Sequence, residues 1–137
     1  MLCLRQRSIN LLAGMLLVSA IGAAAATETS FPFGSELMLD VAPMPGSKRI
    51  PMIEIEENGA ASIDLWCASV EGQANVGDDD TITIVAGALP QAQCTPERQS
   101  RDDNLMAALS QVTKWRRNGE VIELLGAATL RFRLLTN

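Results

Sequence analysis

Apolar and polar residues alternate strictly on both sides of Asn58-Gly59, and this pattern constrains the fold more than any other feature of the chain. Residues 53–56 and 61–67 each carry an apolar side chain at every second position. A period of two is typical of a strand that buries one face and exposes the other. The sequence therefore predicts an antiparallel hairpin that turns at Asn58-Gly59.

The length of this turn decides which residues pair. A two-residue loop would mix the two faces, whereas a three-residue loop with Gly59 in the left-handed conformation sets Ile55 opposite Ala61. We therefore predict the three-residue loop. Continued along the second strand, the alternation places Cys67 on the buried face and Trp66 on the polar face.

One helix interrupts the strands. Thr95 is a good N-cap and Pro96 suits the first helical position, while Ser100 offers a second start that resembles a capping box. Apolar residues at helical spacing then form one stripe, and we expect the helix to end near Thr113. The stripe consists of Leu105, Ala108, Leu109 and Val112.

The other segments are interpreted as short strands joined by turns rich in glycine, asparagine and aspartate. One helix and seven or so antiparallel strands give a mainly β (α+β) fold class. The most economical architecture is a small antiparallel β-barrel with the helix covering one opening, and an open sheet is the alternative. The additional strands are expected over residues 36–41, 71–76, 81–85, 114–117, 120–125 and 130–134.

The first 26 residues have the three parts of a secretory signal peptide: basic Arg5 and Arg7, an apolar stretch and small residues at 24–26. The apolar stretch is shorter than the ~20 residues that a membrane-spanning helix needs. We therefore expect cleavage after residue 24 or 26 and a periplasmic or secreted protein without a membrane span. The expected organisation is a signal peptide over 1–26, a flexible leader over 27–34 and one domain over 35–137.

Export bears directly on the cysteines. Removal of residues 1–26 leaves 111 residues with Cys67 and Cys94, which an oxidising compartment can join. In the chain-entropy model, closing a loop of this length is worth about 3–4 kcal/mol. A structural disulfide is the favoured interpretation. A redox pair lacks the C-x-x-C spacing, and the thiols stay free if their Cα atoms lie more than ~7 Å apart.

The composition excludes several classes of function. The chain has no histidine, which removes Ser-His-Asp and Cys-His nucleophile systems and the commonest transition-metal ligand. Its net charge is −5 and becomes −7 without residues 1–26, which carry two arginines and no acid. Nucleic-acid binding is therefore not expected. We predict a non-enzymatic protein without a cofactor or a bound metal.

A wider pattern runs through the second half of the chain. Gly72 follows Cys67 by five residues, and Cys94 stands just before the helix. With these marks, about residues 35–135 resemble the META domain (HslJ-like) family of secreted bacterial proteins. Other positions that fit the family pattern are Leu105, Leu109, Val112, Trp115, Leu124, Leu130 and Phe132.

The resemblance implies a lipocalin-like β-barrel in an exported protein, with an association to stress response and envelope integrity. It implies no reaction. The chain departs from the family pattern at three places. Trp66-Cys67-Ala68 replaces the usual Gly-Cys-Asn, Pro90 replaces a usual threonine, and residues 36–41 lack the usual tryptophan.

Several acidic groups are candidate sites, and each has a simpler interpretation. Residues 78–80 are three aspartates that offer oxygen ligands for calcium, but they fall in a predicted turn without EF-hand spacing. Residues 102–104 are expected to decorate the first turn of the helix. Glu54, Glu56 and Asp64 share a polar face, where exposure to solvent is a simpler interpretation than acid–base catalysis.

Trp66 and Trp115 are candidate residues for contact with a partner. Trp66 either packs under a loop or marks an exposed patch on the polar face. The arginines of the closing strands form a basic stripe, and cross-strand pairing with Glu120 and Glu123 explains them most simply.

The sequence thus predicts a monomeric, non-enzymatic exported domain that serves the envelope stress response or binds another envelope component. The alternative is a carrier whose barrel holds a small apolar ligand. Against this alternative, small barrels are commonly filled by their own side chains.

Overall fold

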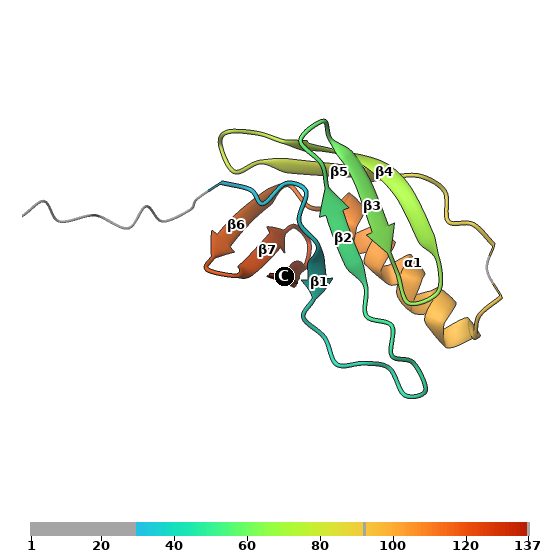
Figure 1. The fold of residues 1–137 in the computed structure, drawn as a ribbon. Coiled ribbons are helices and arrows are strands. Elements are labelled where there is room, and N and C mark those ends of the chain that lie inside the picture. The colour runs from blue at the N-terminus through green and yellow to red at the C-terminus, as the bar shows by residue number, and fades with distance from the viewer. Residues whose placement is uncertain (1–29, 92, 137) are drawn as a thin grey trace, which may run out of the picture.

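The computed structural model describes residues 30–91 and 93–136. The expected signal peptide and residues 27–29 of the expected leader lie outside the described residues. The described chain forms eight strands and one helix (Figure 1). In chain order these are β1 (Leu37–Leu39), β2 (Met52–Ile55), β3 (Ala60–Asp64), β4 (Ser69–Val76), β5 (Ile82–Ala86), α1 (Pro96–Ser110), β6 (Lys114–Asn118), β7 (Val121–Leu125) and β8 (Thr129–Leu134).

All eight strands belong to one antiparallel sheet with the order β5-β4-β3-β2-β1-β8-β7-β6. The two outer strands meet at a short seam, where Thr81 bridges Lys114. At this seam the amide of Ile82 donates to the carbonyl of Thr113 at 3.1 Å. The sheet is therefore a nearly closed barrel, as predicted, and the open sheet is set aside.

The first hairpin has the predicted register. Ile55 pairs with Ala61 and Ile53 pairs with Ile63. Gly59 has a φ of 87°, and a Cβ there would lie 2.6 Å from the carbonyl oxygen of Ala74. The predicted three-residue loop is therefore confirmed, because its left-handed position admits only a residue without a side chain.

The end of β3 departs from the prediction. The strand stops at Asp64, and the amide of Leu65 donates to the carbonyl of Ala68 at 2.8 Å. This tight turn ends the alternation, so both Leu65 and Trp66 are buried while Cys67 is only partly buried. The placement of Trp66 on the outward polar face, and of Cys67 on the core face, is therefore wrong.

The barrel axis is filled by side chains. Apolar residues from the inner faces of the strands and from α1 form one contiguous core. Ten of the largest apolar side chains in it have less than 2% of their surface exposed: Leu37, Ile53, Ile55, Ile63, Leu65, Ile82, Leu109, Ile122, Leu124 and Phe132.

Helix α1 connects β5 to β6 in the chain and packs against β5 (Figure 1). Thr95 is the N-cap, and its hydroxyl accepts from the amide of Arg98 at 3.4 Å. The start at Thr95 and Pro96 is therefore the one the structure has, and Ser100 lies inside the helix. The helix ends at Ser110, before the expected Thr113.

Part of the expected flexible leader is packed against the barrel. The ring of Phe31 meets that of Trp115 edge-to-face at 5.1 Å between centroids. The amide of Gly34 donates to the carbonyl of Ile55 at 2.9 Å. Residues 30–34 thus form a cover over one end of the barrel. Within the described part of the chain, no helix is apolar and long enough to cross a membrane.

Candidate functional site

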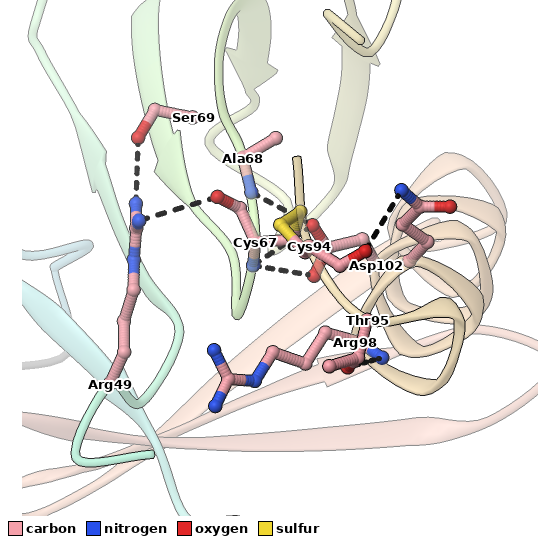
Figure 2. The surroundings of a disulfide bond; sticks show 9 residues. Arg49, Cys67, Ala68, Ser69, Cys94, Thr95, Arg98 and Asp102 are labelled. Atoms are coloured by element: carbon pink, nitrogen blue, oxygen red, sulfur yellow. Dashed lines mark hydrogen bonds between the residues drawn. A yellow bond between two sulfur atoms is a disulfide. The ribbon is translucent and has the colours of Figure 1, made fainter. Parts of the chain in front are cut away.

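The turn after β3 is fastened to the helix by a disulfide. Cys67 in the turn and Cys94 just before α1 are bonded, with their Cα atoms 6.0 Å apart (Figure 2). The predicted disulfide is present in the structure. It holds the turn against the N-terminal part of α1, because Cys94 directly precedes the N-cap.

A buried carboxylate makes a second link between the same two elements. Asp102 is only 2% exposed, and its Oδ2 accepts from the amides of Cys67 at 3.1 Å and Ala68 at 2.9 Å (Figure 2). The expectation that residues 102–104 decorate the first turn of the helix is therefore wrong, because α1 begins at Pro96 and Asp102 is buried beyond that turn. A signal was present in the sequence, because Asp102 lies three residues before Leu105 on the apolar stripe.

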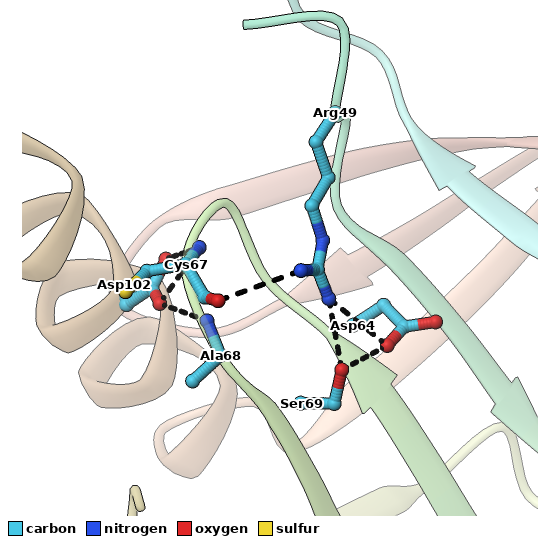
Figure 3. A network of polar contacts seen from close by, with 6 residues as sticks. All are labelled: Arg49, Asp64, Cys67, Ala68, Ser69 and Asp102. Atoms are coloured by element: carbon cyan, nitrogen blue, oxygen red, sulfur yellow. Dashed lines mark hydrogen bonds and ion pairs between the residues drawn. The ribbon is translucent and has the colours of Figure 1, made fainter. Parts of the chain in front are cut away.

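Arg49 holds the opposite side of this turn. Its guanidinium donates to the carbonyl of Cys67 at 3.4 Å and to the hydroxyl of Ser69 at 2.8 Å, and lies 3.3 Å from Oδ1 of Asp64 (Figure 3). The hydroxyl of Ser69 also donates to Asp64. Asp64 is thus occupied in a structural network. We refer to Arg49, Asp64, Cys67, Ala68, Ser69, Cys94 and Asp102 as the turn clamp.

The turn clamp supports Trp66, which lines an open groove. The groove has a volume of about 380 Å³ and lies between one side of α1, the segment that follows the end of β1 and the start of β8. Its walls combine an apolar lining with a polar rim. We call it the α1 groove, and its lining residues are Leu39, Asp40, Val41, Trp66, Arg101, Asn104, Leu105, Ala108, Thr129, Leu130 and Arg131.

Two cations stand on the rim of the α1 groove. The guanidinium carbon of Arg101 lies 5.8 Å from the ring centroid of Trp66, a cation–π arrangement. Arg131 lies 3.6 Å from Glu123 of β7. Asp40 is the acid that lines the groove, and it accepts from Arg133 at 3.0 Å. The groove can therefore offer apolar surface together with positive charge.

Trp115 lies at the other end of the barrel. It packs on Phe31 and lines a smaller cleft of about 230 Å³ with Phe33 and the turn that contains Asp78 and Asp80. Trp66 and Trp115 are 8% and 5% exposed, so neither forms an exposed patch. Of the two positions expected for Trp66, packed or exposed, the structure has the packed one. Contact of either indole with a partner stays a prediction.

Glu54 and Asp64 lie on the same outward face of β2 and β3, as predicted, because the register sets Glu54 opposite Ser62 and Asp64 opposite Met52. Glu54 lies beside Glu56 and Glu36, whereas Asp64 is in the turn clamp. Partial burial, followed by a hydrogen bond with Glu56 and the negative charges of Glu56 and Glu36, raises the pKa of Glu54. The neighbouring carboxylates therefore repel one another, which does not favour an acid–base pair here.

The aspartates of residues 78–80 form the turn between β4 and β5. The hydroxyl of Thr81 donates to Asp79 at 2.6 Å, and this hydrogen bond lowers the pKa of Asp79. Asp80 has a φ of 61°. In the described residues, no group of three or more acidic or cysteine side chains is arranged to hold a metal ion.

The basic residues of the closing strands pair across the sheet. Glu123 of β7 contacts both Arg116 of β6 and Arg131 of β8. The predicted cross-strand pairing is confirmed for Glu123. These contacts are exposed on the arginine side, so each adds little stability.

The sequence matches a family model of the META domain over residues 34–137. A protein structure solved by NMR is similar in fold, with a TM-score of 0.58 and 17% sequence identity, over 73% of this chain and 88% of that protein. At this identity the likeness concerns the fold alone. No curated protein matches the sequence.

Proposed function

This chain belongs to the META domain family, and we propose that it is a non-catalytic binding protein of the bacterial cell envelope. Side chains fill the axis of its barrel, whereas a groove beside α1 stays open. The observation that carries this proposal is the α1 groove itself. The groove joins an apolar lining to a rim with Arg101 and Arg131, a combination typical of binding sites.

The polar groups near the groove support a binding role over a catalytic one. The carboxylate of Asp102 accepts from two backbone amides, and that of Asp40 accepts from Arg133. Both carboxylates are thus engaged by backbone amides or by an arginine, and neither of these partners is a nucleophile. The chain also has no histidine to serve as a general base near neutral pH.

A second candidate function is the carriage of a small apolar ligand. The core side chains occupy the barrel axis, so such a ligand would lie in the α1 groove and outside the barrel. Native mass spectrometry of protein purified from its source tests this candidate. Bound mass that the denatured protein lacks supports carriage, and its persistent absence counts against it.

Photo-crosslinking in the native envelope tests the binding proposal. A photoreactive residue in place of Asn104 lies in the groove, whereas one in place of Ala107 lies on an exposed face of α1 outside it. We expect an adduct with an envelope component from position 104 and none from position 107. Equal background adducts from both positions would refute the groove as the binding site.

We also propose export, with an associated role in envelope stress. The signal-like layout of residues 1–26 and the Cys67–Cys94 bond support it, because disulfides persist in oxidising compartments. Intact-mass analysis of the native protein should show a chain without its first 24 or 26 residues and lighter by two hydrogens. A full-length chain with free thiols would contradict export.

A further inference from the structure

We propose that the α1 groove binds a single-chain anionic amphiphile, with its hydrocarbon tail on the apolar lining and its anionic head beside Arg101 and Arg131. This inference rests on the proposed binding role of the groove and names the chemical class of what it binds. Three features carry it: the chemistry of the lining, the charge of the rim and the state of the backbone around the groove.

The lining favours a hydrocarbon chain. Leu39 and Leu105 form a floor that is only 5% and 6% exposed, while half-buried Ala108 and Leu130 and the 41% exposed Val41 supply the accessible aliphatic carbon. Covering exposed aliphatic surface contributes about 25 cal/mol per Å², so a tail of several methylenes gains affinity roughly in proportion to its length.

The backbone around the groove favours a hydrocarbon chain over a peptide. β1 is paired on both sides, with β2 and with β8. At its end the amide of Asp40 donates to the carbonyl of Arg131, and that of Val41 donates to the carbonyl of Leu39. A peptide in this groove would bury its own amides without partners, which is costly. An acyl chain has no such groups.

The rim favours an anionic head. Arg101 lies 3.7 Å from Glu97, and Arg131 lies 3.6 Å from Glu123, so both contacts are longer than a hydrogen bond. Asp40 is engaged by Arg133. The guanidinium groups therefore keep donors for a carboxylate, and charge-assisted bonds of this kind are among the strongest that a surface site makes. Each of these arginines has an acid nearby, so the rim offers an anionic head guanidinium donors and not an excess of positive charge.

Trp66 supplies a built-in reporter. The chain has two tryptophans, and Trp66 lines the groove while Trp115 lies at the opposite end of the barrel. The indole N–H of Trp66 is buried and has no hydrogen-bond acceptor among the described residues. A change in the electrostatics or hydration of the groove should therefore alter the emission of Trp66.

Dodecanoate, kept below its micellar concentration, is the probe that tests the inference. In a Trp115→Phe variant of the full chain, we expect a saturable change in the emission of Trp66. In Trp66→Phe, the remaining Trp115 should not respond. 1-Dodecanol has the tail without the charge, and acetate has the charge without the tail. Each should bind at least about tenfold more weakly than dodecanoate, because 1-dodecanol loses the charge-assisted hydrogen bond and acetate loses the apolar contact.

Charge variants then place the head. Arg101→Gln should weaken dodecanoate binding about tenfold and leave 1-dodecanol unchanged. Lys48→Gln removes the same charge from an exposed position outside the groove and should change neither. Native mass spectrometry of the wild-type chain with dodecanoate gives the same answer if a tryptophan variant does not fold.

The two proposals fail in different ways. No saturable binding, or equal binding of dodecanoate and 1-dodecanol, overturns the anionic amphiphile. If a protein adduct still forms from position 104 in the envelope, the groove remains the binding site and its occupant is a protein segment. If dodecanoate binds and no adduct forms, the amphiphile stands and the proposed envelope partner falls.

Discussion

The two ends of the barrel differ in what covers their tryptophan. Both Trp66 and Trp115 are buried, and both have an indole N–H without an acceptor among the described residues. Trp115 is covered by Phe31 from the segment before β1, and the rings meet edge-to-face. Trp66 instead lines an open groove with the segment after β1, under the guanidinium of Arg101.

The difference lies in what covers each ring. At the Trp115 end, a piece of the chain supplies aromatic carbon and completes the core. At the Trp66 end, the turn clamp fixes the position of the ring through polar and covalent contacts, while the adjacent surface stays uncovered. A tryptophan held firmly beside open apolar surface is suited to binding, because its rotamer does not have to be ordered when a ligand arrives.

Among the variants that test this difference, removal of the disulfide should lower the free energy of unfolding most. A Cys67→Ser/Cys94→Ser double variant is expected to lose about 3–4 kcal/mol of unfolding free energy, because 27 positions separate the two cysteines and the unfolded chain regains its loop entropy. Urea unfolding with and without a reductant measures this loss. The reductant should destabilise the wild-type chain and leave the variant unchanged; equal sensitivity of both would contradict the assignment.

Phe31→Ala tests the covered end. The side chain is 5% exposed, so truncation leaves a cavity over Trp115 and should cost about 3 kcal/mol. The emission of Trp115, observed in a Trp66→Phe background, should shift to longer wavelength as solvent reaches the ring. Phe33→Ala is the matched control, because Phe33 is 36% exposed and should cost less. Equal losses for both variants would show that residues 30–34 do not cover the core.

Asp102→Ala tests the clamped end. It leaves the buried amides of Cys67 and Ala68 without their acceptor and should cost about 2–3 kcal/mol. Asp103→Ala, at the exposed neighbouring position, should change stability by less than about 0.5 kcal/mol. Thermal unfolding followed by circular dichroism measures both. If the two variants behave alike, Asp102 does not fasten the turn to α1.

Much of the fold was predictable because it is locally encoded. The register of the hairpin formed by β2 and β3 follows from its alternating apolar residues and from the left-handed turn position that Gly59 occupies. The helix start was likewise marked by Thr95 and Pro96. Such features depend on residues within one turn or one pair of strands, so a single sequence suffices to predict them.

The α1 groove and the turn clamp were not predictable in the same way. The position of Trp66 depends on β3 ending at Asp64, and that depends on contacts with Arg49 and Asp102, which lie far away in the sequence. The groove needs segments from four parts of the chain. Alternation within one strand carries no information about where distant segments close over it.

The position of β1 has a consequence for the order of assembly. Leu37 pairs with Ile53 on one side and with Leu134 on the other, so the strand nearest the start of the barrel is completed by the last one. During folding, β2 to β5 can form hairpins from local contacts, but β1 keeps one unpaired edge until residues 129–134 join it. The unpaired backbone groups of such an edge can hydrogen-bond to another unfolded chain. Aggregation of this protein should therefore begin from molecules that stop short of β8.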